Sequence, residues 1–173
     1  QTSVTVMAKA AKADVIPVDI GIASDISVKG LRSKKIAYGT QNMLHAPAMT
    51  KEQTLQALQV GIDLVAELKQ EGYRLIATGE MGIGNTTTSS AIASVLLKVP
   101  VEKVTGKGAG LSSDGLRHKV DVIEQAIKKH KPNCNDPIDV LSKVGGLDIA
   151  GMTGLFLGGA IHRVPVVIDG FVS

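Results

Sequence analysis

Aromatic side chains are nearly missing from this sequence of 173 residues. Tyrosine and phenylalanine occur twice each, tryptophan does not occur, and aromatic residues make up only 2% of the chain. Proteins that bind single-stranded nucleic acid stack its bases on interleaved aromatic rings. The sequence therefore argues against a nucleic-acid partner.

Cysteine is equally scarce. Cys134 is the only one, so no internal disulfide can form, and no histidine or second cysteine lies near it at a metal-ligand spacing. The histidines also share no metal-ligand spacing; they are His45, His118, His130 and His162. We predict no bound metal and no other cofactor. A single thiol fits the reducing cytoplasm.

Long apolar runs and a secretion signal are missing as well. No stretch approaches the ~20 consecutive apolar residues that a membrane-spanning helix needs, and the first residues do not have the form of a signal peptide. The 19 lysines and arginines barely outnumber the 16 acidic residues, and the short basic clusters at 32–35 and 128–131 are predicted to be solvated surface. We expect a cytoplasmic protein without a membrane partner.

A glycine-rich segment is the most informative feature that is present. Residues 79–90 read Gly-Glu-Met-Gly-Ile-Gly-Asn-Thr-Thr-Thr-Ser-Ser and follow a strand-like run at 73–78. Glycines let the backbone turn tightly and approach a ligand, and a helix that opens after them presents free N–H groups that bind phosphate. Glu80, which looks buried beside this anion site, is expected to bind sugar hydroxyls or to stabilise a developing positive charge.

Alternative interpretations of this segment stay open at this point. Glycine-rich turns also occur as plain connections, and Glu80 could simply cap the following helix. The segment lacks the Gly-Lys-Ser/Thr ending of a P-loop and the third glycine of a dinucleotide-binding loop. Phosphate binding remains the favoured interpretation because ligands gather at the carboxyl ends of such strands.

Strand-like and helix-like segments alternate along the chain. Apolar runs at 14–22, 73–78 and 164–171 predict buried strands. Helical spacing, with turn residues at the segment ends, predicts helices at 4–13, 50–72, 86–97, 114–130, 136–144 and 147–162. Near-continuous apolar strands that alternate with helices are typical of parallel sheets. The sequence therefore predicts an α/β fold, and its 44% hydrophobic content suffices for one domain over residues 1–173.

Two of the predicted helices carry specific packing signals. Thr50 and Gln53 form a capping-box pattern at the start of one helix. The same helix has an apolar stripe made of Leu55, Leu58, Ile62, Val65 and Leu68. The glycines of the 147–162 helix predict tight packing, either against the sheet or against a second subunit.

Three acidic residues lie at the carboxyl ends of the predicted strands: Asp19, Glu80 and Asp169. Ligands of parallel sheets bind at that edge, although Asp19 and Asp169 could instead orient loops through hydrogen bonds. Residues 23–48 lack periodicity and are predicted to form a long loop that covers the site. His45, within that loop, is the histidine most worth testing.

Four separated motifs resemble one known family in order and spacing. They are residues 39–42 with 47–49, 79–87, 143–152 and 167–171. Together they resemble the nicotinate-nucleotide:5,6-dimethylbenzimidazole phosphoribosyltransferase family. The resemblance implies homodimers built on a three-layer Rossmann-like core, a parallel sheet with helices on both faces. It also implies a smaller domain made from both chain ends, which this sequence lacks.

The resemblance implies an enzyme, a pentosyltransferase. It would move phosphoribose from nicotinate mononucleotide to 5,6-dimethylbenzimidazole or a similar base, giving α-ribazole 5′-phosphate and nicotinate during assembly of the lower ligand of cobalamin. Glu80 matches an acidic residue with a supporting catalytic role. The matched substrate-binding positions are Met81, Gly82, Ile83, Gly84, Asn85, Thr86, Gly106, Gly108 and Lys119. Asp148 and Asp169, which lie within two of the four motifs, are further candidate substrate-binding residues.

Local pattern and family resemblance disagree at two of these positions. Lys119 lies on an amphipathic helix, where spacing by itself favours a solvated lysine, and only the resemblance places it near substrate. Asp148 follows two glycines and could merely cap the last helix.

The resemblance covers about half of the family's usual length, the middle part. The general-base glutamate is expected after Ser173 and part of the benzimidazole pocket before Gln1. We therefore expect a fragment of a longer enzyme that binds nicotinate mononucleotide weakly and has little activity alone. A non-catalytic nucleotide-binding or dimerisation module with the same fold is the alternative. A dinucleotide-dependent oxidoreductase is disfavoured because its glycine fingerprint is missing.

Overall fold

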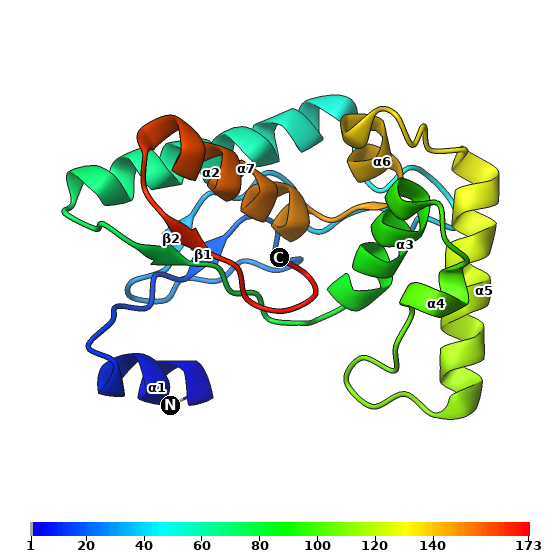
Figure 1. Cartoon of the computed structure of the whole chain (residues 1–173), viewed down its shortest axis with the longest axis horizontal. Helices are drawn as coiled ribbons and strands as arrows, with labels where there is room; N and C mark the ends of the chain where they lie inside the picture. Colours follow the sequence, from blue (N-terminus) through cyan, green and yellow to red (C-terminus); the bar gives the residue numbers. More distant parts are fainter. Residues whose placement is uncertain (1) are drawn as a thin grey trace.

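Helices and short strands follow one another along residues 2–173, the part of the chain that the structure, a computed structural model, describes (Figure 1). The helices are α1 (Ser3–Ala10), α2 (Lys51–Gln70), α3 (Asn85–Leu97), α4 (Val101–Val104), α5 (Ser113–His130), α6 (Pro137–Val144) and α7 (Leu147–His162). The strands are β1 (Val18–Asp19), β2 (Arg32–Ser33), β3 (Ile76–Ala77) and β4 (Val166–Val167).

The strands pair in parallel, which confirms the predicted α/β class. β1 pairs with β2, and β3 pairs with β4 in the register Ile76 to Val166. Ile16 and Val18 pack against the cluster that contains Ile76 and Val164, so the two ladders share a core. In Figure 1, α2 and α7 lie above the strands and α1 lies below them.

Strands β1, β3 and β4 are much shorter than the apolar runs that predicted them, and β2 lies within residues 23–48, which were predicted to form a loop. Each ladder is two residues long and the strands form two pairs. Pro17 and Pro165 directly precede the ladders, where their carbonyls accept hydrogen bonds from Arg32 and Ile76. Because proline has no N–H to donate, it limits further pairing. The apolar runs 14–22 and 164–171 therefore overestimate the strands.

Helices α2 and α7 pack with their backbones in near contact. A Cβ atom on Gly154 would lie 1.9 Å from the carbonyl oxygen of Leu58, and one on Gly61 would lie 2.1 Å from that of Gly151. On the other side of α7, a Cβ on Gly159 would lie 2.6 Å from Val166 Cγ2. The glycines of α7 therefore allow tight packing, as predicted. They pack against α2 on one side of the helix and against β4 on the other.

The capping box of α2 is confirmed. Thr50 Oγ1 accepts a hydrogen bond from Gln53 N at 3.1 Å, and Thr50 N donates to Gln53 Oε1 at 2.9 Å. The predicted stripe needs one correction, because Leu55 is 48% exposed. Leu55 lies about 120° around the α2 axis from Gly61, the residue that α7 contacts, so its side chain faces away from α7.

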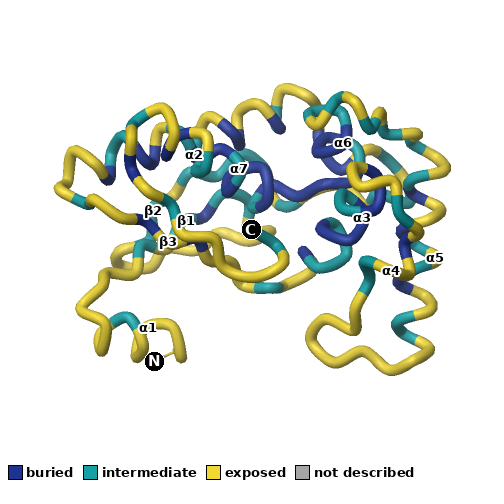
Figure 2. The backbone as a smooth tube through the Cα atoms, viewed as in Figure 1, coloured by how far each residue is buried: buried dark blue, intermediate teal, exposed yellow. Residues whose placement is uncertain are grey.

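A second part of the core joins α3, α5 and α6. Ala91, Ile123 and Val140 are fully buried there, and Cys134 packs against this cluster. Asp136 caps α6 by accepting hydrogen bonds from Ile138 N and Asp139 N, each at 3.1 Å. Figure 2 shows the buried backbone running from α7 through α6 into α3, so the amino-terminal ends of α3 and α7 are anchored by the core.

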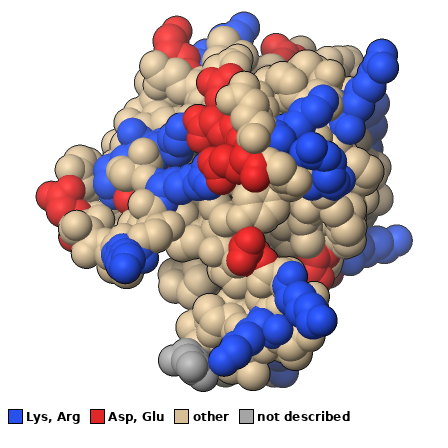
Figure 3. All heavy atoms as spheres, turned by 90° about the vertical axis from the view of Figure 1, so that its left-hand side faces the viewer, with Lys and Arg blue, Asp and Glu red and all other residues tan. Residues whose placement is uncertain are grey.

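The basic cluster at 32–35 is not simply solvated, as the sequence suggested. Arg32 and Lys34 pair with Glu67 and Glu71 of α2, with nitrogen–oxygen distances between 2.6 and 3.5 Å. Figure 3 shows acidic and basic side chains side by side on this face. Because oppositely charged neighbours cancel, this face has no uniform positive field.

Candidate functional site

The loop between β3 and α3 turns through two left-handed glycines. Gly82 has φ +73° and Gly84 has φ +79°, conformations that favour glycine. Gly84 is the N-cap of α3 and provides no side-chain oxygen to the free N–H groups of the first turn. The predicted arrangement of a glycine turn before an open helix start is therefore present, and it suits an anion.

Met81 and Ile83 alternate with these glycines and point outward. Their exposed fractions are 80% and 85%. A ligand held by this loop would meet backbone groups, while the two side chains remain available to cover it.

Glu80 is exposed and not buried as the sequence suggested. Its Oε2 atom accepts hydrogen bonds from Gly82 N and from Asn85 Nδ2. The loop turns back at Gly82, so the carboxylate is tied to its own loop at one oxygen and faces solvent elsewhere. A simple capping role is not what the structure shows.

Asn85, the first residue of α3, connects the loop to α7. It is only 4% exposed, and its Nδ2 donates to Asp148 Oδ2 at 3.0 Å as well as to Glu80. Gly146, and not Asp148, is the N-cap of α7, so the capping alternative for Asp148 is wrong. The link between positions 85 and 148 spans 63 residues and carries no local sequence signal.

Lys119 is buried, contrary to the solvated lysine that its helical spacing favours. It is 7% exposed, and its Nζ donates to Thr86 Oγ1 at 2.9 Å and to the carbonyl of Gly106 at 3.2 Å. No ion pair among residues 2–173 includes Lys119. Burial lowers the pKa of this ammonium below its ordinary value. A buried cation with only neutral partners favours an anionic ligand.

The second glycine turn, residues 106–108, packs against Thr86 and Lys119. Gly108 has φ +56°, and a Cβ atom there would lie 3.0 Å from Thr86 Oγ1 and 3.6 Å from Lys119 Nζ. The structure therefore brings together the β3–α3 loop, the start of α3, the 106–108 turn, α5 and the start of α7.

Among the described residues, the other two acidic strand ends make no hydrogen bond or ion pair with this group. Asp169 is exposed; its carbonyl accepts from Ser173 Oγ, which lies 3.0 Å from Thr78 Oγ1 at the end of β3. Asp19 is buried and pairs with Lys35 at 2.8 Å while it accepts from Gly21 N and Ile22 N. Burial raises the pKa of Asp19, but the Lys35 ammonium and the two N–H groups outweigh it and lower the pKa below its ordinary value. Asp19 thus orients a turn.

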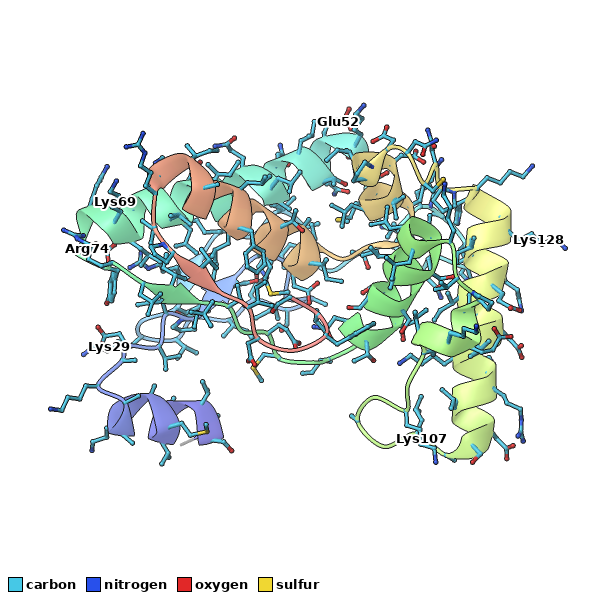
Figure 4. The ribbon with its side chains drawn as sticks, viewed as in Figure 1. Lys29, Glu52, Lys69, Arg74, Lys107 and Lys128 are labelled. Carbon is cyan, nitrogen blue, oxygen red and sulfur yellow. The ribbon has the colours of Figure 1, made fainter. Side chains whose placement is uncertain are left out.

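Residues 43–45, the part of the predicted covering loop that carries His45, do not lie over this group. Lys129 Nζ donates to the carbonyls of Leu44 and His45, and the ring of His130 bonds to the carbonyl of Met43. These contacts hold the loop at the carboxyl end of α5, about 15 Å along the helix from Lys119. Figure 4 labels Lys107, in the turn that precedes α5, and Lys128, in the last turn of α5.

Comparison with known proteins identifies the family of this chain. A family model described as phosphoribosyltransferase matches residues 1–173. Nicotinate-nucleotide–dimethylbenzimidazole phosphoribosyltransferases from Clostridium acetobutylicum and Ruminiclostridium cellulolyticum are 54% and 51% identical over 172 residues, 99% of this chain and 49% of each relative. The chain belongs to this phosphoribosyltransferase family. It spans about half the length of these curated relatives.

A solved phosphoribosyltransferase structure agrees. The crystal structure of CobT from Thermus thermophilus superposes with a TM-score of 0.92 at 35% identity, covering 99% of this chain and 51% of that one. Among residues 2–173 we find no helix long and apolar enough to cross a membrane. The same residues contain no group of three potential metal ligands.

Proposed function

We propose that this chain binds nicotinate mononucleotide and takes part in transferring its phosphoribosyl group to 5,6-dimethylbenzimidazole or a similar base. The products are α-ribazole 5′-phosphate and nicotinate, and the reaction belongs to assembly of the cobalamin lower ligand. The observation that carries the proposal is Lys119, a buried cation beside the open start of α3 that has no acidic partner within residues 2–173. The names of the relatives supply the reaction class.

The phosphate of the nucleotide binds between the α3 start and Lys119. Backbone N–H groups after Gly84 and the Lys119 ammonium supply positive potential there, and Thr86 contributes a hydroxyl that already contacts Lys119. A fixed phosphate holds the ribose and limits its motion during the reaction.

The chemical step breaks the bond between the anomeric carbon and the nicotinate nitrogen. The bonding electron pair stays on nicotinate, a benzimidazole nitrogen forms the new bond to the same carbon, and the proton on the other benzimidazole nitrogen passes to water or to a general base. Positive charge grows on the ribose as the first bond lengthens. The carboxylates of Glu80 and Asp148, held beside the phosphate site by Asn85, stabilise that charge.

Lys119→Met tests the phosphate site directly. The substitution keeps the apolar stem and removes the charge, so nicotinate mononucleotide should bind about 10- to 100-fold more weakly, the range expected for a charge-assisted hydrogen bond. Isothermal titration of the 173-residue chain measures this affinity, with inorganic phosphate as a competitor.

Lys128→Met is the matched control, because Lys128 is an exposed lysine on the same helix. It should bind nicotinate mononucleotide like the unchanged chain. Equal binding by the Lys119→Met variant would contradict the proposed phosphate site. Nicotinate release after addition of 5,6-dimethylbenzimidazole, followed by chromatography in the same samples, reports transfer.

A further inference from the structure

Two carboxylates in this site share one amide group. Asn85 Nδ2 donates to Glu80 Oε2 and to Asp148 Oδ2. An amide nitrogen has two hydrogens, so each carboxylate takes one of them. The two acceptor oxygens therefore lie within two hydrogen-bond lengths of each other, and no ion pair among residues 2–173 includes either carboxylate.

One oxygen of each carboxylate stays available. Among the described residues, Glu80 Oε1 and Asp148 Oδ1 accept no hydrogen bond, because every bond to these side chains uses Oε2 or Oδ2. The Asn85 Oδ1 atom is also buried without a partner. Buried polar atoms normally have partners, so this group is incomplete within residues 2–173.

The backbone leaves room for the free oxygen of Asp148. A Cβ atom on Gly146 would lie 2.6 Å from Asp148 Oδ1. The φ of Gly146 is −141°, a conformation that any residue adopts. A Cβ atom at position 146 would therefore displace the end of the Asp148 side chain without straining the turn.

The chemistry of the pair selects hydroxyl donors. The free carboxylate oxygens accept hydrogen bonds and repel anions. A metal ion would need further ligands, and no third acidic, histidine or cysteine side chain joins the pair within residues 2–173. The neighbouring residue, Thr86, contacts Lys119, so adjacent positions of α3 face an anion-binding side and a hydroxyl-binding side.

We propose that Asn85 is a positioning residue that holds Glu80 and Asp148 as a pair, and that their free oxygens bind the two vicinal hydroxyls of a ribose. This inference rests on the proposed function. It makes Asp148 a residue that determines specificity for ribose over deoxyribose, acting together with Glu80.

The test compares nicotinate mononucleotide with its 2′-deoxy analogue by titration of the full 173-residue chain. The unchanged chain should bind the ribonucleotide about 10-fold more tightly, the effect of one hydrogen bond to a charged group. Asp148→Asn and Asn85→Asp should each reduce this preference to about 2-fold or less. Asp121→Asn, the same change at an exposed aspartate of α5, should keep it.

The double variant Asn85→Asp with Asp148→Asn restores an amide donor between the two positions with the roles exchanged. It should recover part of the ribose preference that Asn85→Asp loses, a result that a purely structural role for Asn85 does not produce. Competition by inorganic phosphate, measured on each variant, reports whether the neighbouring anion site is still folded.

The outcomes separate the two proposals. Equal binding of both nucleotides by the unchanged chain, or an unchanged preference in Asp148→Asn, overturns the inference and leaves the proposed function standing. Failure of the unchanged chain to bind either nucleotide overturns both.

Discussion

Lys119 shows most clearly how one residue links stability and binding. Its ammonium is buried and has a hydroxyl and a carbonyl as partners. Such a group destabilises the free protein, since removing a charge from water is unfavourable unless a counter-charge replaces it. In the proposed site, a bound phosphate would provide that counter-charge, so the burial of Lys119 is explained by the proposed ligand.

The pH dependence of stability follows from the lowered pKa of Lys119. The folded protein binds this proton less tightly than the unfolded chain, whose lysines titrate near 10.5. Stability should therefore rise with pH between the lowered folded value and 10.5. Lys119→Met should be at least as stable as the unchanged chain at pH 7 and should lose this rise.

Denaturant unfolding at pH 7 and at pH 10 measures the effect, with Lys128→Met as control. Added phosphate should stabilise the unchanged chain more than Lys119→Met. Lower stability of Lys119→Met at pH 7 would contradict a destabilising buried charge.

At the scale of elements, the limits of the helices depend on nearby residues, whereas those of the strands depend on residues far apart in the chain. The limits of α6 and α7 agree with prediction because their signals, Asp136 with Pro137 and the glycine pair at 145–146, sit beside the helix ends. The strands depend on pairing between β3 and β4, which lie far apart in the chain. An apolar run reports burial but not how many residues pair.

The contact between α2 and α7 depends on glycine at its centre. Gly154→Ala places a Cβ atom against the carbonyl of Leu58, so the helices must separate. We expect a loss of about 1–3 kcal/mol in the free energy of unfolding, the usual range for overpacking.

Gly79→Ala is the matched control for this helix contact, because a Cβ atom at Gly79 meets nothing within 4 Å. Chemical denaturation followed by circular dichroism compares the two variants. Equal stability of Gly154→Ala and the unchanged chain would show that the backbones are not in near contact.

The whole molecule keeps large apolar side chains on its surface. Leu157 and Ile161, one turn apart near the carboxyl end of α7, are exposed by 47% and 61%. Large exposed apolar patches mark interaction surfaces. The homodimer implied by the family resemblance stays a prediction, and this side of α7 is one surface on which it can be tested.

We predict concentration-dependent self-association of the chain in sedimentation velocity experiments. Ile161→Glu should shift the distribution toward monomer, since a charge in an apolar interface is unfavourable. Leu55→Glu, at an exposed leucine of α2, should not. A monomer at every concentration would refute the prediction for this chain.

The sequence by itself determined what depends on neighbouring residues: every described helix except α4, the capping box of α2 and the glycine turn before α3. Tertiary structure alone decided that Lys119 is buried, that Glu80 is exposed, that Asn85 joins two carboxylates, and that His45 lies at the far end of α5. The physical reason is the distance along the chain over which each interaction acts. Backbone propensity and capping act over a few residues, whereas burial and charge pairing depend on which distant segments meet.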